Sequence, residues 1–134
     1  MQNPKFETAP IFANNVSGFL AFLRIDEEST IISPRRFSLA LSIDVRTLAA
    51  DAAIHQNTIL HAPASESVQR HLRDSLRIIR ASIDISGHVE KSIFWYKNSH
   101  IPLFDYMTAQ TLVSKGRTDD LMRYLQSLDI GFTG

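Results

Sequence analysis

Hydrophobic residues recur at steps of three and four along much of the chain, which is the spacing of one face of an α-helix. A short series of this kind occurs early, over residues 16–23, after two prolines that interrupt the preceding segment and without a strong capping residue. The most regular series consists of Val68, Leu72, Leu76, Ile79 and Ile83. We therefore predict an all-α fold, a small helical bundle.

Capping residues indicate where the central helices begin. Serine, aspartate and threonine accept hydrogen bonds from the free N–H groups of a first helical turn, and proline is tolerated at the first helical position. The predicted caps are Ser33, with Pro34 after it, then Asp44, and either Ser65 or Ser67 after the break at Pro63.

The C-terminal third predicts three more helices. Ser86 is expected to cap a helix that ends near Trp95, and a polar turn closed by Pro102 follows. Thr108 is expected to cap a short helix that Gly116 stops, because glycine adopts the left-handed cap without steric cost.

The last helix is predicted to begin at Thr118, with two aspartates in its first turn, where the helix dipole favours negative charge. Leu121, Leu125 and Leu128 form its expected buried stripe, and Gly131 is expected to end it.

We predict three regions on this basis. Residues 1–33 form an N-terminal arm of unknown role, with a short helix around residues 17–24. Residues 34–82 form a compact group of short helices, and residues 83–134 form a second compact helical unit.

Composition limits the functions to consider. The chain has 134 residues, 44% of them hydrophobic and 21% charged, which is typical of a globular protein. Fourteen basic side chains balance fourteen acidic ones, so no excess positive charge attracts a polyanion. The chain lacks cysteine and any apolar run of the roughly 18–20 residues that span a bilayer. We expect a cytoplasmic protein that acts without membrane, cofactor or small-molecule substrate.

Four arginines follow helical spacing beside the most regular apolar series: Arg70, Arg73, Arg77 and Arg80. They could hold phosphates or an acidic partner surface. The alternative is a solvated helix face, partly neutralised by Glu66 and Asp74.

The sequence carries no complete catalytic or metal-binding motif. No two of the five histidines stand three or four residues apart to form, with a carboxylate, the ligand pattern typical of a helix. Neither a glycine-rich phosphate loop nor a Gly-x-Ser-x-Gly motif occurs, and the adjacent Asp119 and Asp120 point apart. We expect neither an enzyme nor a metal site.

From Phe94 to the C-terminus the chain carries an ordered set of short motifs. The set comprises Phe94-Trp95-Tyr96, Ile101-Pro102-Leu103-Phe104-Asp105, Thr108-Ala109-Gln110-Thr111-Leu112-Val113, Gly116-Arg117, Leu121, Tyr124-Leu125 and Gly131-Phe132-Thr133-Gly134. In order and spacing it resembles the toxin-binding domain of the Xre/MbcA/ParS-type antitoxins. Relatives often carry glycine in the loop near Asp105, where this chain has Tyr106 and Met107.

The resemblance implies a partner and a mechanism. Antitoxins of this family neutralise a RES-domain toxin, which consumes NAD, and their C-terminal tail enters the active-site cleft of the toxin. The implied toxin-binding tail is Gly131, Phe132, Thr133 and Gly134, with Trp95 and Arg117 as further candidates. The tail could also be a plain helix cap, and Trp95 could be a lid on the small core.

Residues 48–59 resemble the helix-turn-helix core of the same family. Ala49 is small where two helices would cross, and Ala53 stands where many such motifs have glycine, so a positive φ would strain the turn. The implied DNA-binding residues are His55, Gln56, Asn57 and Thr58 at the start of a recognition helix, with Arg46 for phosphate contact. A packing unit without DNA binding is the alternative, since the recognition segment lacks Arg and Lys.

Two functional hypotheses follow. The first is an antitoxin of a type II toxin–antitoxin system that blocks its toxin with the C-terminal tail and could bind promoter DNA as a homodimer. The second is a dimeric helix-turn-helix transcriptional regulator whose C-terminal part only dimerises.

Overall fold

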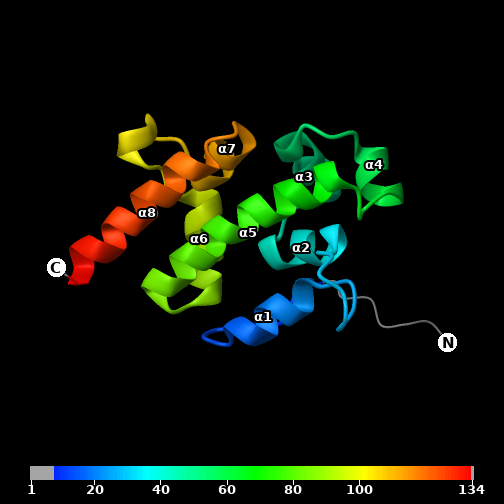
Figure 1. The fold of residues 1–134 in the computed structure, drawn as a ribbon, viewed down its shortest axis with the longest axis horizontal. Helices are drawn as coiled ribbons and strands as arrows, with labels where there is room; N and C mark the ends of the chain where they lie inside the picture. The colour runs from blue at the N-terminus through cyan, green and yellow to red at the C-terminus, as the bar shows by residue number, and fades with distance from the viewer. Residues whose placement is uncertain (1–7, 134) are drawn as a thin grey trace.

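The computed structural model describes residues 8–133, with side chains as far as Leu128. Within this range the chain is all-helical, as the hydrophobic spacing predicts, and it has no strand beyond two isolated bridges (Figure 1). The elements are α1 (Val16–Leu23), α2 (Pro34–Leu41), α3 (Val45–Ala52), α4 (Gln56–His61), α5 (Glu66–Ser86), α6 (Val89–Asn98), the 3₁₀ helix η1 (Pro102–Phe104), α7 (Ala109–Ser114) and α8 (Thr118–Thr133).

Helix α5 runs through the middle of the bundle and contacts α2, α6, α7 and α8 (Figure 1). Its predicted apolar face is confirmed, because Val68, Leu72, Ile79 and Ile83 are buried and Leu76 is half-buried. The long amphipathic helix therefore organises the core around itself.

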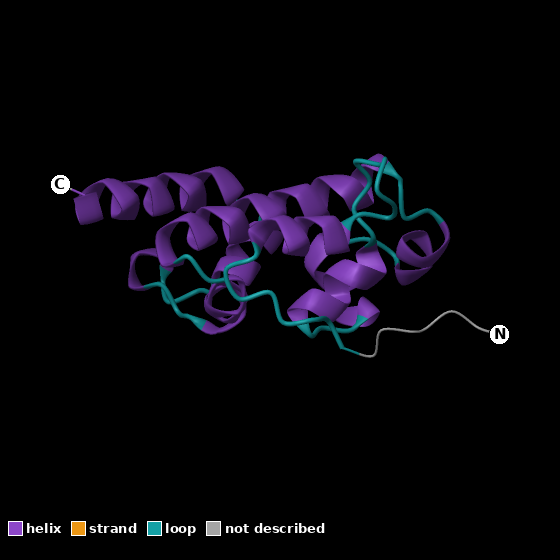
Figure 2. Cartoon of the chain, turned by 90° about the horizontal axis from the view of Figure 1, so that it is seen from below, coloured by secondary structure: helices purple, strands orange, loops and turns teal. Residues whose placement is uncertain are grey.

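The segment that precedes α2 packs against the bundle. Phe12, Phe19, Leu23 and Ile32 belong to the buried core, and Phe12 and Phe19 meet edge to face with ring centroids 5.4 Å apart. Asn15 caps α1 by accepting a hydrogen bond from the Gly18 backbone at 2.9 Å, a cap that the sequence pattern did not single out. Side chains from residues 8–33 thus form part of the core. In Figure 2 the loop that follows the grey N-terminal trace runs along the helices.

Glu90 of α6 fixes the start of this segment. Its carboxylate accepts hydrogen bonds from the backbone N–H of Phe12 at 2.8 Å and of Ala13 at 2.9 Å. The Val89 N–H donates in turn to the Ala13 carbonyl at 2.8 Å. Two hydrogen bonds to the Glu90 carboxylate and one between backbone groups therefore link the segment before α1 to the start of α6.

The predicted boundary between residues 82 and 83 lies inside α5. Across it, α3 contacts α7, and Gln110 Nε2 donates to Asp51 Oδ2 at 2.6 Å. A single cluster of buried side chains extends from Phe12 to Leu125.

Most predicted helix starts are confirmed. Ser33, Asp44 and Thr108 each accept a hydrogen bond from the third residue of the helix that follows. Of the two serines proposed for α5, Ser65 stands at the cap position, although its hydroxyl makes no capping bond. Ser86 is not the cap of α6, because α5 continues through it; His88 takes that role and accepts from the Lys91 N–H at 3.2 Å.

The last helix begins at Thr118 as predicted, and Leu121 and Leu125 are buried. Leu128 was predicted to be buried but is 39% exposed. In Figures 1 and 2 the C-terminal turns of α8 lie at one extremity of the molecule, so fewer neighbours cover them there.

Gly131 does not end α8, which continues to Thr133. Glycine lowers helix stability by about 1 kcal/mol relative to alanine, but it keeps its backbone donor and leaves the hydrogen-bond ladder intact. A glycine near a chain end is therefore a weak stop signal.

Candidate functional site

The turn between α3 and α4 has a left-handed residue, Ala53, at the position where many helix-turn-helix motifs have glycine. Ala53 has φ 54° and ψ 43°, the Ala53 N–H donates to the Ala50 carbonyl, and the Ile54 N–H donates to the Ala49 carbonyl at 3.0 Å. This pair of bonds is a Schellman motif, which glycine usually closes. Alanine at a positive φ strains the turn, as expected for a residue that replaces glycine.

The residues around this turn support it by packing. Ala49 is buried where α3 meets α4, and Ile59 of α4 is 3% exposed. The small and large apolar positions predicted for the motif therefore have the expected burial.

The four residues predicted to begin the recognition helix divide into two kinds. His55 caps α4, and its ring Nδ1 accepts the Asn57 N–H at 3.2 Å, so the imidazole has a structural role. Gln56 and Asn57 are exposed, Thr58 is half-buried, and none of these three side chains makes a hydrogen bond to the rest of residues 8–133. The amides of Gln56 and Asn57 are thus presented to solvent.

Basic side chains near α4 differ in whether they are exposed to solvent or bound to other parts of the chain. Arg46 and Arg35 are exposed at the starts of α3 and α2. Arg36 is bound internally, since its guanidinium donates to the Phe22 and Arg24 carbonyls and lies 5.5 Å from the centroid of the Phe22 ring.

The arginine row on α5 is partly neutralised by acidic side chains. Glu66 pairs with Arg73 at 2.8 Å and with Arg70 at 3.8 Å, whereas Arg77 pairs with Asp119 of α8 at 3.6 Å. Of the two neutralising groups predicted, Glu66 forms ion pairs with this row, whereas Asp74 forms none with the described residues. Asp119 lies on another helix, so spacing along α5 could not reveal it as a partner.

Trp95 and Arg117 have internal contacts that account for them. Trp95 is half-buried against the core, beside the fully buried Tyr96. The Arg117 Nε donates to Asp120 Oδ2 at 3.1 Å, and its guanidinium lies 5.1 Å from the centroid of the Phe104 ring. Arg117 thus links the start of α8 to Phe104 of η1.

The loop near Asp105 keeps the backbone shape that glycine favours without containing glycine. Asp105 has φ 55° and Tyr106 has φ 64°, both in the left-handed region. The departure from the family pattern therefore changes the side chains of the loop but keeps a left-handed backbone.

The predicted toxin-binding tail is helical at Gly131, Phe132 and Thr133, whereas Gly134 lies outside the described residues. In Figure 1 this end of α8 lies far from α2 and α4. The two sets of predicted site residues, the tail and the start of α4, are thus widely separated on the molecule.

Sequence reasoning missed a polar pocket between α3, α5 and α7. Asp51, His71, Asp74 and Ser114 line a hollow of about 300 Å³. Burial lowers the pKa of His71 below its ordinary value of 6.5, and the two carboxylates oppose that change. Burial also raises the pKa of nearby Tyr96 well above its usual range. His71 is one turn from Asp74, a spacing that could have drawn attention to the pair.

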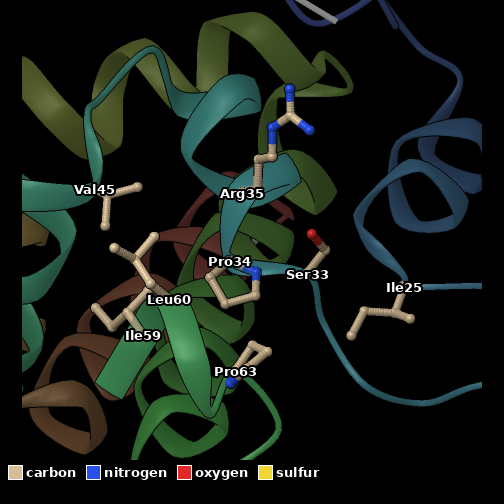
Figure 3. Close-up of a pocket in the computed structure, with 8 residues that line it drawn as sticks. All are labelled: Ile25, Ser33, Pro34, Arg35, Val45, Ile59, Leu60 and Pro63. Atoms are coloured by element: carbon tan, nitrogen blue, oxygen red, sulfur yellow. The ribbon is translucent and has the colours of Figure 1, made fainter. Parts of the chain in front are cut away.

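A second missed feature is an apolar groove of about 430 Å³ between α2, α4 and the loop after α1 (Figure 3). Its apolar lining consists of Ile25, Pro34, Val45, Ile59, Leu60 and Pro63. Arg35 is the only charged residue among the described residues that line it, and its side chain extends outward at the edge (Figure 3).

Among the described side chains, which end at Leu128, no three His, Asp or Glu residues gather into a group that could hold a metal ion. None of the described helices is long and apolar enough to cross a lipid bilayer.

Comparison with known proteins finds no family model, no curated protein and no solved structure that matches this chain. The resemblance to the antitoxin family therefore rests on the motifs of the chain itself.

Proposed function

We propose that this protein is the antitoxin of a type II toxin–antitoxin pair and that it neutralises a RES-domain toxin, which consumes NAD. The observation that carries the proposal is the ordered run of motifs from Phe94 to Gly134. The helix boundaries are consistent with that run, because Thr108 caps the start of α7, Gly116 follows the end of α7 at φ 76°, and Thr118 begins α8.

In the proposed mechanism, the C-terminal end of α8 enters the active-site cleft of the toxin and blocks NAD entry. The position of this end at one extremity of the molecule supports the mechanism, because the rest of the bundle would not obstruct its approach (Figure 1). The C-terminus of a helix carries partial negative charge. This charge would favour a cationic group in the toxin that otherwise holds a phosphate.

A role as a repressor of its own operon is proposed as a second activity of the same protein. The exposed amides of Gln56 and Asn57 after the Ala53 turn favour it, because Gln and Asn side chains make paired hydrogen bonds to adenine edges in the major groove. A dimeric transcriptional regulator without toxin binding is the alternative function.

Co-expression with the product of the adjacent gene tests the proposal. Cell growth, intracellular NAD and co-purification are measured for the full chain and for a truncation after Ile130. We expect the full chain to restore growth and NAD, and the truncated chain to lose neutralisation while keeping its helical circular dichroism.

The double variant Gln56→Ala/Asn57→Ala is the matched control. It should neutralise the toxin normally and lose the sequence-dependent, salt-sensitive mobility shift of upstream DNA. An adjacent product that is harmless alone and forms no complex would remove the antitoxin proposal. If the DNA shift persisted under those conditions, the regulator would be the better account.

A further inference from the structure

The turn after α6 exposes two large apolar side chains to solvent, and hydrogen bonds hold its backbone. Leu103 is 71% exposed and Tyr106 is 65% exposed. Between them Asp105 is exposed and makes neither a hydrogen bond nor an ion pair within residues 8–133. We call Leu103, Asp105 and Tyr106 the knob.

Several hydrogen bonds hold the knob in one shape. The Ile101 N–H donates to the Met107 carbonyl at 3.0 Å, and the Ile101 carbonyl accepts from the Phe104 and Tyr106 N–H groups. The His100 ring Nδ1 lies 2.8 Å from the Tyr106 carbonyl. The turn is thus fixed from both ends.

Folding does not explain the side chains of the knob. A left-handed conformation costs roughly 1–2 kcal/mol in most residues other than glycine and less in aspartate, and the turn contains Asp105 and Tyr106 in this conformation in succession. Tyr106 offsets little of that cost by burial, because most of its surface faces solvent. Strained and exposed aromatic residues are typical of binding surfaces.

The groove between α2 and α4 has the complementary chemistry. Its lining is almost entirely apolar, and Leu60 at its edge is 55% exposed. The one charged residue of its lining, Arg35, is exposed and has no hydrogen bond or ion pair to other described residues. The knob thus offers two apolar side chains and one free carboxylate, and the groove offers an apolar hollow and one free guanidinium.

We propose that the knob of one copy of this chain docks into the α2–α4 groove of a second copy, with Asp105 facing Arg35. Leu103 and Tyr106 would fill the groove, and a carboxylate–guanidinium pair would fix the orientation. The proposal is independent of the antitoxin function.

The positions of the two surfaces define the kind of assembly. In Figure 1 the turn that follows α6 and the region of α2 and α4 lie toward opposite ends of the long axis. A single knob-to-groove contact uses the knob of one copy and the groove of the other, and it leaves one knob and one groove free. We expect head-to-tail association that continues to higher oligomers or closes into a ring. A contact of this size is weak, with Kd in roughly the micromolar range or above.

Sedimentation equilibrium of the purified full chain tests the proposal over a wide concentration range. Average mass should rise with concentration beyond that of a dimer. Tyr106→Gly should weaken association about tenfold or more, although it relieves the positive φ and should not lower the unfolding temperature. Leu60→Ser should weaken association from the side of the groove.

Ile11→Ser is the matched control, since Ile11 is 86% exposed and belongs to neither surface. It should leave the association unchanged.

Charge exchange tests the pairing itself. Asp105→Arg and Arg35→Asp should each associate about tenfold more weakly than the natural chain when studied alone. In an equimolar mixture, the arginine of one variant knob can pair with the aspartate of the other variant groove. The natural aspartate of the second variant's knob can likewise pair with the natural arginine of the first variant's groove. The mixture should therefore associate in alternating order, with a higher average mass than either variant alone.

Several results would overturn the proposal. A chain that stays monomeric throughout, or that forms a dimer unaffected by Tyr106→Gly and Leu60→Ser, has no knob-to-groove contact. Failure of the charge-exchanged mixture to pair would have the same meaning. The proposal would also be overturned if Tyr106→Gly abolished co-purification with the toxin and left self-association unchanged. The knob would then bind the toxin and not a second copy of the chain.

Discussion

Left-handed residues other than glycine mark the ends of two helices. Ser42 after α2 and Ala53 after α3 both have φ near 55°, and each closes a Schellman motif. The corresponding position after α7 is Gly116, which adopts φ 76° without a side-chain clash. The chain thus tolerates the same backbone shape at different steric cost.

Ala53→Gly is predicted to stabilise the protein by about 0.5–1 kcal/mol, because glycine removes the cost of the left-handed conformation. Ala53 is exposed, so no packing is lost. Urea unfolding measures the gain. The control is Ala50→Gly, an exposed position in the interior of α3, which should destabilise by about 0.5–1 kcal/mol. Equal destabilisation by both variants would contradict the strain at Ala53.

Gln69 joins three segments through one buried amide. Its Oε1 accepts from the Ile32 N–H at 2.9 Å, and its Nε2 donates to the Ile32 and Pro63 carbonyls at 2.8 and 2.9 Å. Gln69 is 2% exposed, so water cannot easily replace these bonds. The side chain therefore fixes the segments before α2 and α5 to the core.

Gln69→Met keeps the volume and leaves the Ile32 and Pro63 groups without partners. We expect a loss of about 2–4 kcal/mol in the free energy of unfolding, since buried polar groups without hydrogen bonds are costly. Gln126→Met on the exposed face of α8 should change it by less than about 0.5 kcal/mol. A similar small effect at both positions would show that Gln69 does not hold the segments.

At the scale of elements, α3, α5 and α7 meet around polar side chains. Gln110 of α7 donates a hydrogen bond to Asp51 of α3. Asp51 lines a pocket together with Arg70, His71 and Asp74 of α5. Burial disfavours the charged imidazolium of His71, so the folded protein binds this proton less readily than the unfolded chain does.

The free energy of unfolding should consequently be fully retained above pH 6.5 and fall as the pH drops below that value. Asp44 and Asp120 have pKa values lowered from 3.8 by hydrogen bonds, chiefly from Thr47 and Arg117, so their stabilisation is lost only in stronger acid. Urea unfolding between about pH 8 and about pH 5 measures the free energy of unfolding in the range where histidine side chains change charge and aspartates do not. His71→Gln should flatten the pH dependence, whereas His61→Gln at an exposed site should not. Parallel curves for all three proteins would contradict this role of His71.

Local signals in the sequence predict where most helices begin. Burial and pockets depend on contacts between distant segments, so the sequence pattern does not predict them. The caps at Ser33, Asp44 and Thr108 depend only on neighbouring residues, and they are confirmed. The packing of Phe12 and the exposure of Leu128 depend on where other helices lie, which periodicity does not encode. Among candidate site residues, the exposure of Gln56 follows from helical spacing, but the groove between α2 and α4 arises only from tertiary packing.

At the scale of the whole molecule, one core connects all regions of the described chain. Helix α5 crosses the residue 82/83 position that the sequence indicates as a boundary, and Glu90 holds the backbone of Phe12 and Ala13. Buried residues on both sides of that position belong to the same cluster. Neither part can bury its apolar face without the other.

The full chain is therefore predicted to unfold in a single two-state transition, with equal calorimetric and van't Hoff enthalpies. Fragments 1–82 and 83–134, expressed separately, should lack cooperative unfolding, because the cut divides α5 and exposes both faces of the core. As a control, a protease site placed in the exposed turn at residues 26–28 should allow cleavage without loss of helical signal, since that turn contributes no buried side chain. Two separate transitions, or a cooperatively folded 83–134 fragment, would contradict the single core. In that case the C-terminal part could bind its partner as an independent domain, and α5 would act as a connector between two folded units.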